Sequence, residues 1–454
     1  MAISLLIVGH ANTGKTSLIR TLMRDRSFGE VDNRSGTTRH VEEIQLAVNG
    51  QTLLRLIDTP GFEDSIGLWQ TRTHESYRSQ TNSEWLEQVV KSPSLTPEFE
   101  QEFKILKQLP HCDIILYLID LRQAPLGKYL NELDILACAN KPIVPVLNFC
   151  ETEPNHLTEW KSRLAERQLH AHVRYDTVAF YFADERKLYQ TLQSLSPDHY
   201  NALQSLISQR QQDAEQRLQR AQHQLTQTLL ACATYQYACR NAAPSEQDKQ
   251  AFESHIRTLE QHFIQRCLTI YEFQSDDVAL QDLAIVGNEW EQDLFDSETL
   301  KSWGINTTTV AATGAAIGAG IDILSAGLTL GTATTVGALL GASWQTGQSF
   351  KATLMNKLRN RAVLSANSST LIALLYRGTE LINHLHHRGH AAHIAFQSSN
   401  STTSNKEDIA GLDRLFKKLN QRIEWTSEDL DSELPKHALI TELKSEVERL
   451  STKD

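Results

Sequence analysis

Residues 9–16 read GHANTGKT and directly follow a short apolar run, Ile3–Val8. This spacing fits the pattern GxxxxGK[ST], in which an apolar strand precedes the loop and a helix follows it. The backbone N–H groups of such a loop, together with the helix N-terminus, form a concavity that binds anions. The alternative, a chance glycine turn, leaves the order of strand, loop and helix unexplained. The sequence therefore predicts a phosphate-binding loop on an α/β sheet.

Two residues of this loop carry side chains suited to binding a nucleoside triphosphate. Lys15 would place a positive charge on the β- and γ-phosphates, and the Thr16 hydroxyl would serve as a Mg²⁺ ligand.

Asp58 begins the sequence DTPG after the apolar run Leu53–Ile57. A carboxylate at the end of a buried strand can hold Mg²⁺ through water, and Gly61 can offer its N–H to a γ-phosphate. Alone, DTPG would be an ordinary turn.

The segment SGTTRH at residues 35–40 lies between these two motifs. A threonine here can complete the Mg²⁺ shell only while γ-phosphate is present, which would make the segment an order–disorder switch. Without the neighbouring motifs, the same residues would be interpreted as a polar turn.

Short β-branched runs alternate with helical patterns from Met1 to about Ser194. This alternation predicts an α/β P-loop NTPase fold with a mostly parallel sheet and flanking helices. The predicted strands are Ile3–Val8, Ile44–Val48, Leu53–Ile57, Ile114–Ile119, Ile143–Leu147 and His172–Thr177. Beyond Pro197 helical patterns replace the strands, which predicts an all-α C-terminal domain.

We divide the chain into three parts: a nucleotide-binding domain (1–195) with an insertion at about 62–110, a stalk of long helices (196–300), and a helical domain (301–454). Apolar residues at spacings of three, four and seven predict a long, coiled-coil-like helix over Ala202–Ala233. A second helix is expected after Pro244, with Ser245 as its N-cap, to about Tyr271.

The Gly- and Ala-rich run 306–344 predicts a close-packed helical hairpin that turns at Ser325–Gly327, because it holds three GxxxG spacings. Each arm is shorter than the ~20 residues that cross a bilayer. Packing inside a soluble helical domain and shallow, nucleotide-gated membrane insertion both remain open. Helical pattern resumes over Lys351–His390, residues 397–405 are expected to be a disordered loop, and two further helices are expected, one before and one after Pro435.

Charge and cysteine content exclude several classes of protein. The net charge is −11, with 44 basic and 55 acidic residues, which argues against strong nucleic-acid binding. The six cysteines include no CxxC pair, so a disulfide-dense secreted scaffold and a zinc ribbon are excluded and a cytoplasmic location is expected. Cys232 and Cys239 are expected to be buried on one helix face. The histidines between His384 and His393 could hold zinc or phosphate, or could lie on the surface.

These motifs resemble those of the Era/TrmE-like GTPases over residues 1–195. The resemblance rests on GxxNxGK[ST], TTRH, DTPG and the order DIILYLID…KPIVPVLN. The chain is similar, more closely, to an uncharacterised bacterial family that fuses an Era-like G domain to a helical domain of unknown function. The resemblance implies a Mg²⁺-dependent GTPase. It implies catalytic roles for Lys15, Thr38, Asp58 and Gly61, Mg²⁺ ligands at Thr16, Thr38 and Asp58, and nucleotide contacts from Gly9, Asn12, Thr13, Gly14, Lys15, Thr16, Ser17, Asn148, Phe149, Glu151 and Ala179.

Two positions refine this expectation. Asn12 matches the position that binds a potassium ion in TrmE-like members, with the switch backbone at Thr37 closing the coordination. Such an ion would spread positive charge onto the leaving group. Phe62 stands where Ras-like proteins have a glutamine that orients water. A phenyl ring cannot do this by hydrogen bonding, so a low intrinsic rate is expected.

The base-reading motif departs from the family pattern. NKxD is replaced by Asn148-Phe149-Cys150-Glu151. Asn148 fits its expected role, Phe149 could stack on the base, and Glu151 offers two acceptors with one extra methylene. The alternative for Glu151 is a solvated loop acid. Ala179 stands where relatives use a backbone N–H toward the guanine oxygen.

The leading functional hypothesis is a slow GTPase switch that binds GTP and GDP and reports its state to an unknown protein partner through the insertion and the helices. The alternative is a nucleotide-gated scaffold or membrane-associating protein, peripheral at the inner face of the membrane, whose working part is 306–344. A third hypothesis is a pseudo-GTPase that binds nucleotide without turnover. Ribosome binding cannot be carried over, since no basic GxxG loop in a βα context is present.

Overall fold

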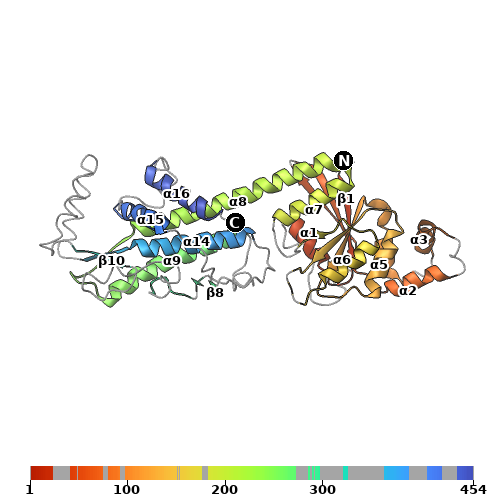
Figure 1. The fold of residues 1–454 in the computed structure, drawn as a ribbon, viewed down its shortest axis with the longest axis horizontal. Helices are drawn as coiled ribbons and strands as arrows, with labels where there is room; N and C mark the ends of the chain where they lie inside the picture. The colour runs from red at the N-terminus through yellow and green to blue at the C-terminus, as the bar shows by residue number, and fades with distance from the viewer. Residues whose placement is uncertain are drawn as a thin grey trace. The chain divides into compact units, whose positions relative to one another are not determined.

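The structure is a computed structural model that describes residues 2–23, 41–48, 50–74, 80–92, 98–150, 152, 154–175, 182–271, 285–286, 289–290, 292–296, 321–325, 362–387, 406–421 and 437–452. The chain forms two compact units (Figure 1). The main part of the first is Met1–Gln216, and the main part of the second is Arg217–His386. The boundary falls inside one long helix. The predicted three-part division stays a prediction.

A six-stranded sheet forms the centre of the first unit, with strand order β2-β3-β1-β4-β5-β6. Its strands are β1 (Ile3–Gly9), β2 (Glu42–Val48), β3 (Gln51–Asp58), β4 (Ile114–Asp120), β5 (Ile143–Asn148) and β6 (Val173–Arg174). Only β2 runs antiparallel to its neighbour. A strand lies at each of the six predicted positions, but in the predicted run His172–Thr177 the strand β6 spans only Val173–Arg174, and residues 176–177 lie outside the described residues. β1 and β5 are buried along their whole length, as expected for strands that helices cover on both faces.

Helices cover both faces of this sheet (Figure 1). On one face, α1 (Lys15–Met23), α7 (Phe182–Leu195) and the start of α8 (Tyr200–Thr234) share a core through Leu18, Leu188 and Leu203, among others. On the other, α5 (Gly127–Ala137) and α6 (Leu157–Glu166) pack through Leu133 and Trp160. The predicted mostly parallel sheet with flanking helices is confirmed.

The segment between β3 and β4 forms its own helical layer. It contains α2 (Ser65–Gln70), α3 (Asn82–Val90) and α4 (Glu100–Leu106), with short 3₁₀ turns at Thr71–Thr73 and Leu109–His111. Thr81 caps α3 in a capping box with Glu84. Trp69 and Trp85 meet edge to face with ring centroids 5.7 Å apart, and Trp85 is fully buried. This layer shares the α5–α6 core, so it is an integral part of the first unit.

The second unit is largely helical, as predicted. It contains the end of α8, together with α9 (Glu246–Tyr271), α14 (Ser368–His387), α15 (Lys406–Leu419) and α16 (Ala438–Leu450). The long helix predicted over Ala202–Ala233 is confirmed as α8. Ser245 is the N-cap of α9, as predicted: its hydroxyl accepts the N–H of Asp248 at 3.2 Å, and Asp248 accepts the N–H of Ser245 at 3.0 Å.

A small sheet in this unit was not predicted. Its order is β10-β11-β7, with β7 at Gln236–Ala238, β10 at Ile321–Ser325 and β11 at Ala362–Ala366. A separate two-stranded ladder pairs β8 (Ile285–Val286) with β9 (Glu289–Trp290). The prediction of continuous helix from Lys351 is wrong at β11. Asn367 accepts the N–H of Thr370 and so caps α14, which fixes the helix start just after this strand.

The predicted helical hairpin is contradicted where the structure describes it, because β10 pairs antiparallel with β11. The remainder of 306–344, and the loop 397–405, lie outside the described residues. Cys232 and Cys239 are both buried, as predicted, but they do not share a helix face. α8 ends at Thr234, and Cys239 follows β7. All six cysteines are free.

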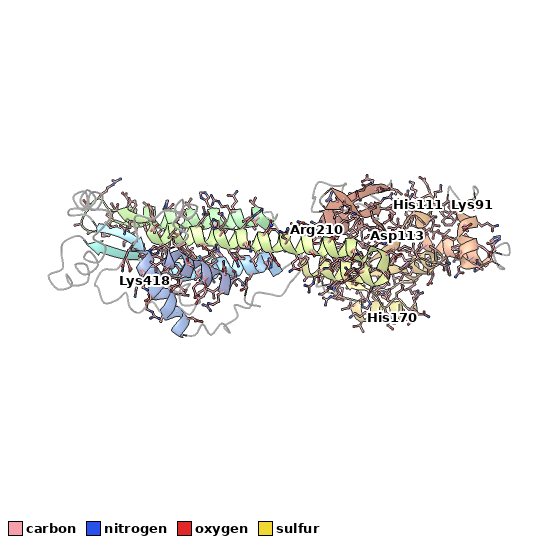
Figure 2. All side chains as sticks on the ribbon, turned by 90° about the horizontal axis from the view of Figure 1, so that it is seen from above. Lys91, His111, Asp113, His170, Arg210 and Lys418 are labelled. Carbon is pink, nitrogen blue, oxygen red and sulfur yellow. The ribbon has the colours of Figure 1, made fainter. Side chains whose placement is uncertain are left out.

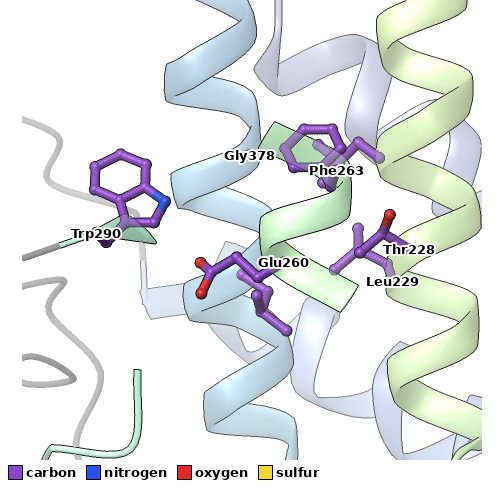
Figure 3. Close-up of a pocket in the computed structure, with 8 residues that line it drawn as sticks. Thr228, Leu229, Glu260, Phe263, Trp290 and Gly378 are labelled. Atoms are coloured by element: carbon purple, nitrogen blue, oxygen red, sulfur yellow. The ribbon is translucent and has the colours of Figure 1, made fainter. Parts of the chain in front are cut away.

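A buried charge network lies between α9 and α14. Arg377 is 2% exposed, and its guanidinium donates to Glu260 Oε1 at 3.3 Å and to the backbone carbonyl of Gln292. The guanidinium lies over the Trp290 ring, 5.2 Å from its centroid. Figure 3 shows Glu260 and Trp290 beside a small hollow that Gly378 also lines. A Cβ atom at Gly378 would lie 2.3 Å from Leu225 Cδ1, so a larger residue there would displace the Leu225 side chain of α8.

Candidate nucleotide-binding site

The glycine-rich loop lies at the carboxyl end of β1, where it leads into α1. A Cβ atom at Gly9 would lie 2.7 Å from the carbonyl oxygen of Leu118, so only glycine fits beside β4. Gly14 and Asn12 adopt left-handed backbone conformations, with φ of 96° and 62°. The Thr13 hydroxyl donates to the His10 carbonyl at 3.0 Å. These local constraints close the loop around the start of α1.

The Lys15 ammonium lies inside this loop. It is 7% exposed and donates to the carbonyl oxygens of Gly9 at 3.2 Å and His10 at 2.8 Å. Burial lowers the pKa of Lys15 to about 8, while Asp58 and Glu132 act in the opposite direction. The lysine therefore supplies a desolvated positive charge, which binds an anion more strongly than an exposed ammonium does.

Asp58, at the end of β3, meets Thr16, in the first turn of α1. The Thr16 hydroxyl donates to Asp58 Oδ2 at 3.0 Å, and the Thr59 N–H donates to Oδ1 at 3.0 Å. Burial raises the pKa of Asp58 to about 6, against the lowering effect of Lys15. A hydroxyl and a carboxylate at this distance form an oxygen donor pair that suits Mg²⁺. No group of three or more His, Cys, Asp or Glu that could hold a metal occurs among the described residues.

The segment after β3 lies directly against the loop. A Cβ atom at Gly61 would lie 2.6 Å from the backbone nitrogen of Ala11. The Phe62 N–H donates to the Gly9 carbonyl at 3.4 Å, and the Phe62 side chain is fully buried. Glycine at 61 is thus required for the two segments to meet.

Asn148, at the end of β5, ties this strand to the loop. Its side-chain nitrogen donates to the Thr13 carbonyl at 2.9 Å, and its side-chain oxygen accepts the Phe149 N–H at 2.9 Å. Phe149 has a left-handed backbone with φ of 57°. The Arg122 guanidinium lies 3.7 Å from the centroid of its ring, and Asp120 holds that guanidinium through two bonds of 2.9 and 2.8 Å.

The structure thus brings together most of the predicted site residues: Gly9, Asn12, Thr13, Gly14, Lys15, Thr16, Asp58 and Gly61 lie in or against the loop, Ser17 follows in α1, and Asn148 and Phe149 join it from β5. Four predicted residues, Thr37, Thr38, Glu151 and Ala179, lie outside the described residues.

Several residues around the loop were not predicted. His10 Nδ1 lies 2.9 Å from Glu132 Oε1, and its Nε2 lies 3.1 Å from Lys128 Nζ. Because an ammonium can only donate, Nε2 accepts and Nδ1 carries the proton that faces the carboxylate. Tyr117 donates to the other Glu132 oxygen at 2.8 Å. Arg122, two residues beyond the end of β4, is another residue near the loop that was not predicted. Its position directly after a predicted strand is the sequence feature that could have indicated it.

The histidine pattern near the end of α14 is described only in part. His386 Nδ1 lies 3.4 Å from the Tyr271 hydroxyl. The remaining members from residue 388 to His393 lie outside the described residues.

Comparison with known proteins decides the family. A sequence profile described as a 50S ribosome-binding GTPase matches residues 4–149. A second, described as a domain of unknown function (DUF3482), matches residues 161–445, more than half of the chain. The chain belongs to the DUF3482 family. The N-terminal part of this DUF3482 protein is an Era/TrmE-like P-loop GTPase domain, as the motifs predicted.

Individual relatives match between a third and less than half of the DUF3482 protein. GTPase Der from Campylobacter curvus is 27% identical over 157 residues, which are 35% of this chain and 27% of Der. The tRNA modification GTPase MnmE from Helicobacter acinonychis is 32% identical over 152 residues, 33% of this chain and 27% of MnmE. Among solved structures, an Aquifex aeolicus Era variant bound to GDP·AlF4⁻ is 20% identical, with a TM-score of 0.31, over 43% of this chain and 57% of that chain. The chain spans about a quarter of the length of these curated relatives.

Among the described residues of the DUF3482 protein, no helix combines the length and the apolar character needed to cross a bilayer.

Proposed function

We propose that this DUF3482 protein binds GTP with Mg²⁺, hydrolyses it slowly to GDP and phosphate, and uses the nucleotide state as a switch that is read by its helical region and by a protein partner. The observation that carries this proposal is the convergence of Lys15, the Asp58–Thr16 pair and Asn148 on one loop. These residues supply the charge, the metal ligands and the link to the base site that a bound nucleotide needs.

The residues divide the chemistry of water attack on the γ-phosphate among them. Lys15 would neutralise charge on the β- and γ-oxygens, and Gly61 would offer its N–H to the γ-phosphate. Thr16, Asp58 and Thr38 would hold Mg²⁺, and the bound ion would supply positive charge against the negative charge of the phosphates. Thr38 lies outside the described residues, and its role rests on the family resemblance. Phe62 is fully buried and cannot orient water, which supports a low intrinsic rate.

A contact in the first unit supports coupling to the helices. Arg210 of α8, labelled in Figure 2, is 8% exposed and donates to the Leu22 carbonyl in the last turn of α1 at 2.6 Å. It also lies 3.1 Å from Glu185. α1 begins at Lys15, whereas α8 continues to Thr234 in the second unit. α1 follows directly from the nucleotide loop, and α8 contacts α1 through Arg210. α8 is therefore also the helix that continues from the first unit into the second.

A nucleotide titration tests the proposal. We expect GTP and GDP in magnesium buffer to bind the full chain, and GTP to be converted slowly to GDP. ATP should bind more weakly if Glu151 accepts the guanine edge, because an edge-reading site rejects the wrong base by ~10⁴ or more. If no purine nucleotide binds in the presence of Mg²⁺, the proposal is wrong.

The potassium hypothesis has its own test. Asn12 is an exposed residue of the loop and has a left-handed backbone. We expect hydrolysis to be faster in KCl than in NaCl for the wild type, and the difference to disappear in Asn12→Ala. Equal wild-type rates in the two salts would remove potassium from the mechanism.

The alternative function, membrane association through 306–344, gains no support from the described residues. Within that run, β10 pairs in a sheet.

A further inference from the structure

Glu102 is a buried carboxylate in α4, inside the insertion. It is 2% exposed, and its Oε1 atom accepts the backbone N–H groups of Glu63 and Asp64, both at 2.7 Å. Hydrogen bonds to an ionised acceptor are shorter and stronger than neutral ones. Glu102 thereby holds the backbone of a segment that lies almost 40 residues earlier in the chain.

The residues that Glu102 holds come directly after the segment that touches the phosphate loop. Gly61 lies against Ala11, and Phe62 is bonded to Gly9. On the other side, Asp64 caps α2 by accepting the Gly67 N–H at 2.8 Å. The Ser65 hydroxyl then donates to the Lys128 carbonyl at 2.7 Å, so the start of α2 is also fixed to the start of α5. The backbone from residue 61 to residue 65 therefore has an anchor on each side.

Position matters here, because hydrolysis depends on where the Gly61 N–H lies relative to the γ-phosphate. A misplacement of about 1 Å at a reacting group can cost about 100-fold in rate. The phenyl ring of Phe62 brings no hydrogen bond that could correct the backbone. Glu102 supplies the hydrogen bonds that fix this backbone, and it does so from the insertion.

We propose that Glu102 is a positioning residue for GTP hydrolysis: it fixes residues 61–64 against the phosphate loop, so that the insertion sets the rate of turnover. This inference rests on the proposed GTPase function. The helix α4 then controls the position of residues 61–64, and any partner that displaces α4 would lower the rate of GTP hydrolysis.

The test compares three substitutions of Glu102 and one matched control in the full chain. Glu102→Leu removes the acceptor at similar volume, and we expect kcat for GTP to fall at least about 10-fold, while GDP affinity changes less than about 2-fold because the phosphate loop is untouched. Glu102→Gln keeps a carbonyl oxygen at the same place and should retain at least about a third of wild-type kcat. Glu102→Asp keeps the charge but withdraws it by one methylene, and should resemble the leucine variant. Glu100→Leu, on an exposed residue of the same helix, is the matched control and should behave as wild type.

The outcomes separate this inference from the function on which it depends. If the leucine and aspartate variants turn over GTP at the wild-type rate, Glu102 is only structural and the inference is wrong. Equal losses in the glutamine and leucine variants would also contradict it, because the acceptor oxygen would then not be what matters. If Glu102→Leu fails to fold, the comparison of kcat between Glu102→Gln and Glu102→Asp still tests the inference. A wild-type protein that binds no nucleotide would instead overturn the proposed function.

Discussion

Replacement of Lys15 by methionine is expected to weaken GTP and GDP binding by about 100-fold or more. The ammonium is 7% exposed and lies within the loop at hydrogen-bond distance of two carbonyl oxygens. Loss of one partner of a buried, hydrogen-bonded charge pair costs about 2–5 kcal/mol, which is roughly 30-fold to several thousand-fold in affinity. The measurement is a titration of fluorescent GTP and GDP analogues against the wild type and Lys15→Met. Hydrolysis should fall to the background rate, since the same charge acts on the γ-phosphate.

The same substitution should not destabilise the nucleotide-free protein. Burial lowers the pKa of Lys15 from 10.5 to about 8, so folding at neutral pH is less favourable by about 3 kcal/mol than it would be for an unperturbed lysine. Between pH 8 and 10.5 the unfolded chain binds the proton and the folded chain does not, so this cost declines as pH rises. Methionine removes the cost. We therefore expect the free energy of unfolding of Lys15→Met to equal or exceed that of the wild type at pH 7, and the difference to shrink toward pH 10.

Lys91→Met is the matched control, because that ammonium is exposed at the end of α3 and is labelled in Figure 2. It should leave binding and stability unchanged. Wild-type nucleotide affinity in Lys15→Met would show that the loop does not bind the triphosphate. If the wild type binds GTP but in a single-turnover assay converts it no faster than Lys15→Met, the protein is a pseudo-GTPase.

The sequence was informative wherever function depends on local spacing. The loop from Gly9 to Thr16 and the position of Asp58 follow from short motifs next to apolar strands, because parallel strands bring their carboxyl ends to one edge of the sheet. Asn148 could be placed for the same reason, at the end of the predicted fifth strand. Its bond to Thr13, 135 residues earlier, shows that the fold brings the end of β5 to the loop that follows β1.

The residues that were not predicted depend on contacts between distant segments. Glu102 lies in a short helix with no motif of its own, and only the folded insertion places it against Glu63. His10 occupies a position that the pattern GxxxxGK[ST] leaves open, and its role becomes visible only with Glu132, which is 122 residues away. The strand β11 has the composition AVLSA, in which small residues fit a helix as well as a strand. Its pairing with β10 and β7 determines that the segment is a strand, and periodicity in the sequence cannot show that pairing.

The largest effect on stability is expected in the second unit, at Arg377. Arg377→Met should lower the free energy of unfolding by about 3–5 kcal/mol, because it leaves Glu260 buried without its partner. Glu260 is 8% exposed, and the Arg377 guanidinium is 3.3 Å from it. Methionine has a similar length and cannot donate to Glu260 or to the Gln292 carbonyl. The measurement is chemical denaturation followed by circular dichroism. Arg257→Met, on a partly exposed arginine of α9 that pairs with Glu253 and Asp293, is the control and should cost about 1 kcal/mol or less.

The loss at Arg377 should depend on pH with a defined sign. Burial raises the pKa of Glu260, and it raises that of Glu380 to about 7, while Arg377 lowers both. Without Arg377 both pKa values rise further, so the folded protein must hold protons that the unfolded chain releases, and stability falls as pH rises. The difference between wild type and Arg377→Met should therefore be larger at pH 8 than at pH 5. At pH 5 the variant can protonate both acids, whereas the wild type begins to lose the Glu260 carboxylate that pairs with its arginine. An equal loss at both pH values would mean that Arg377 acts through packing against Trp290 and not through its charge.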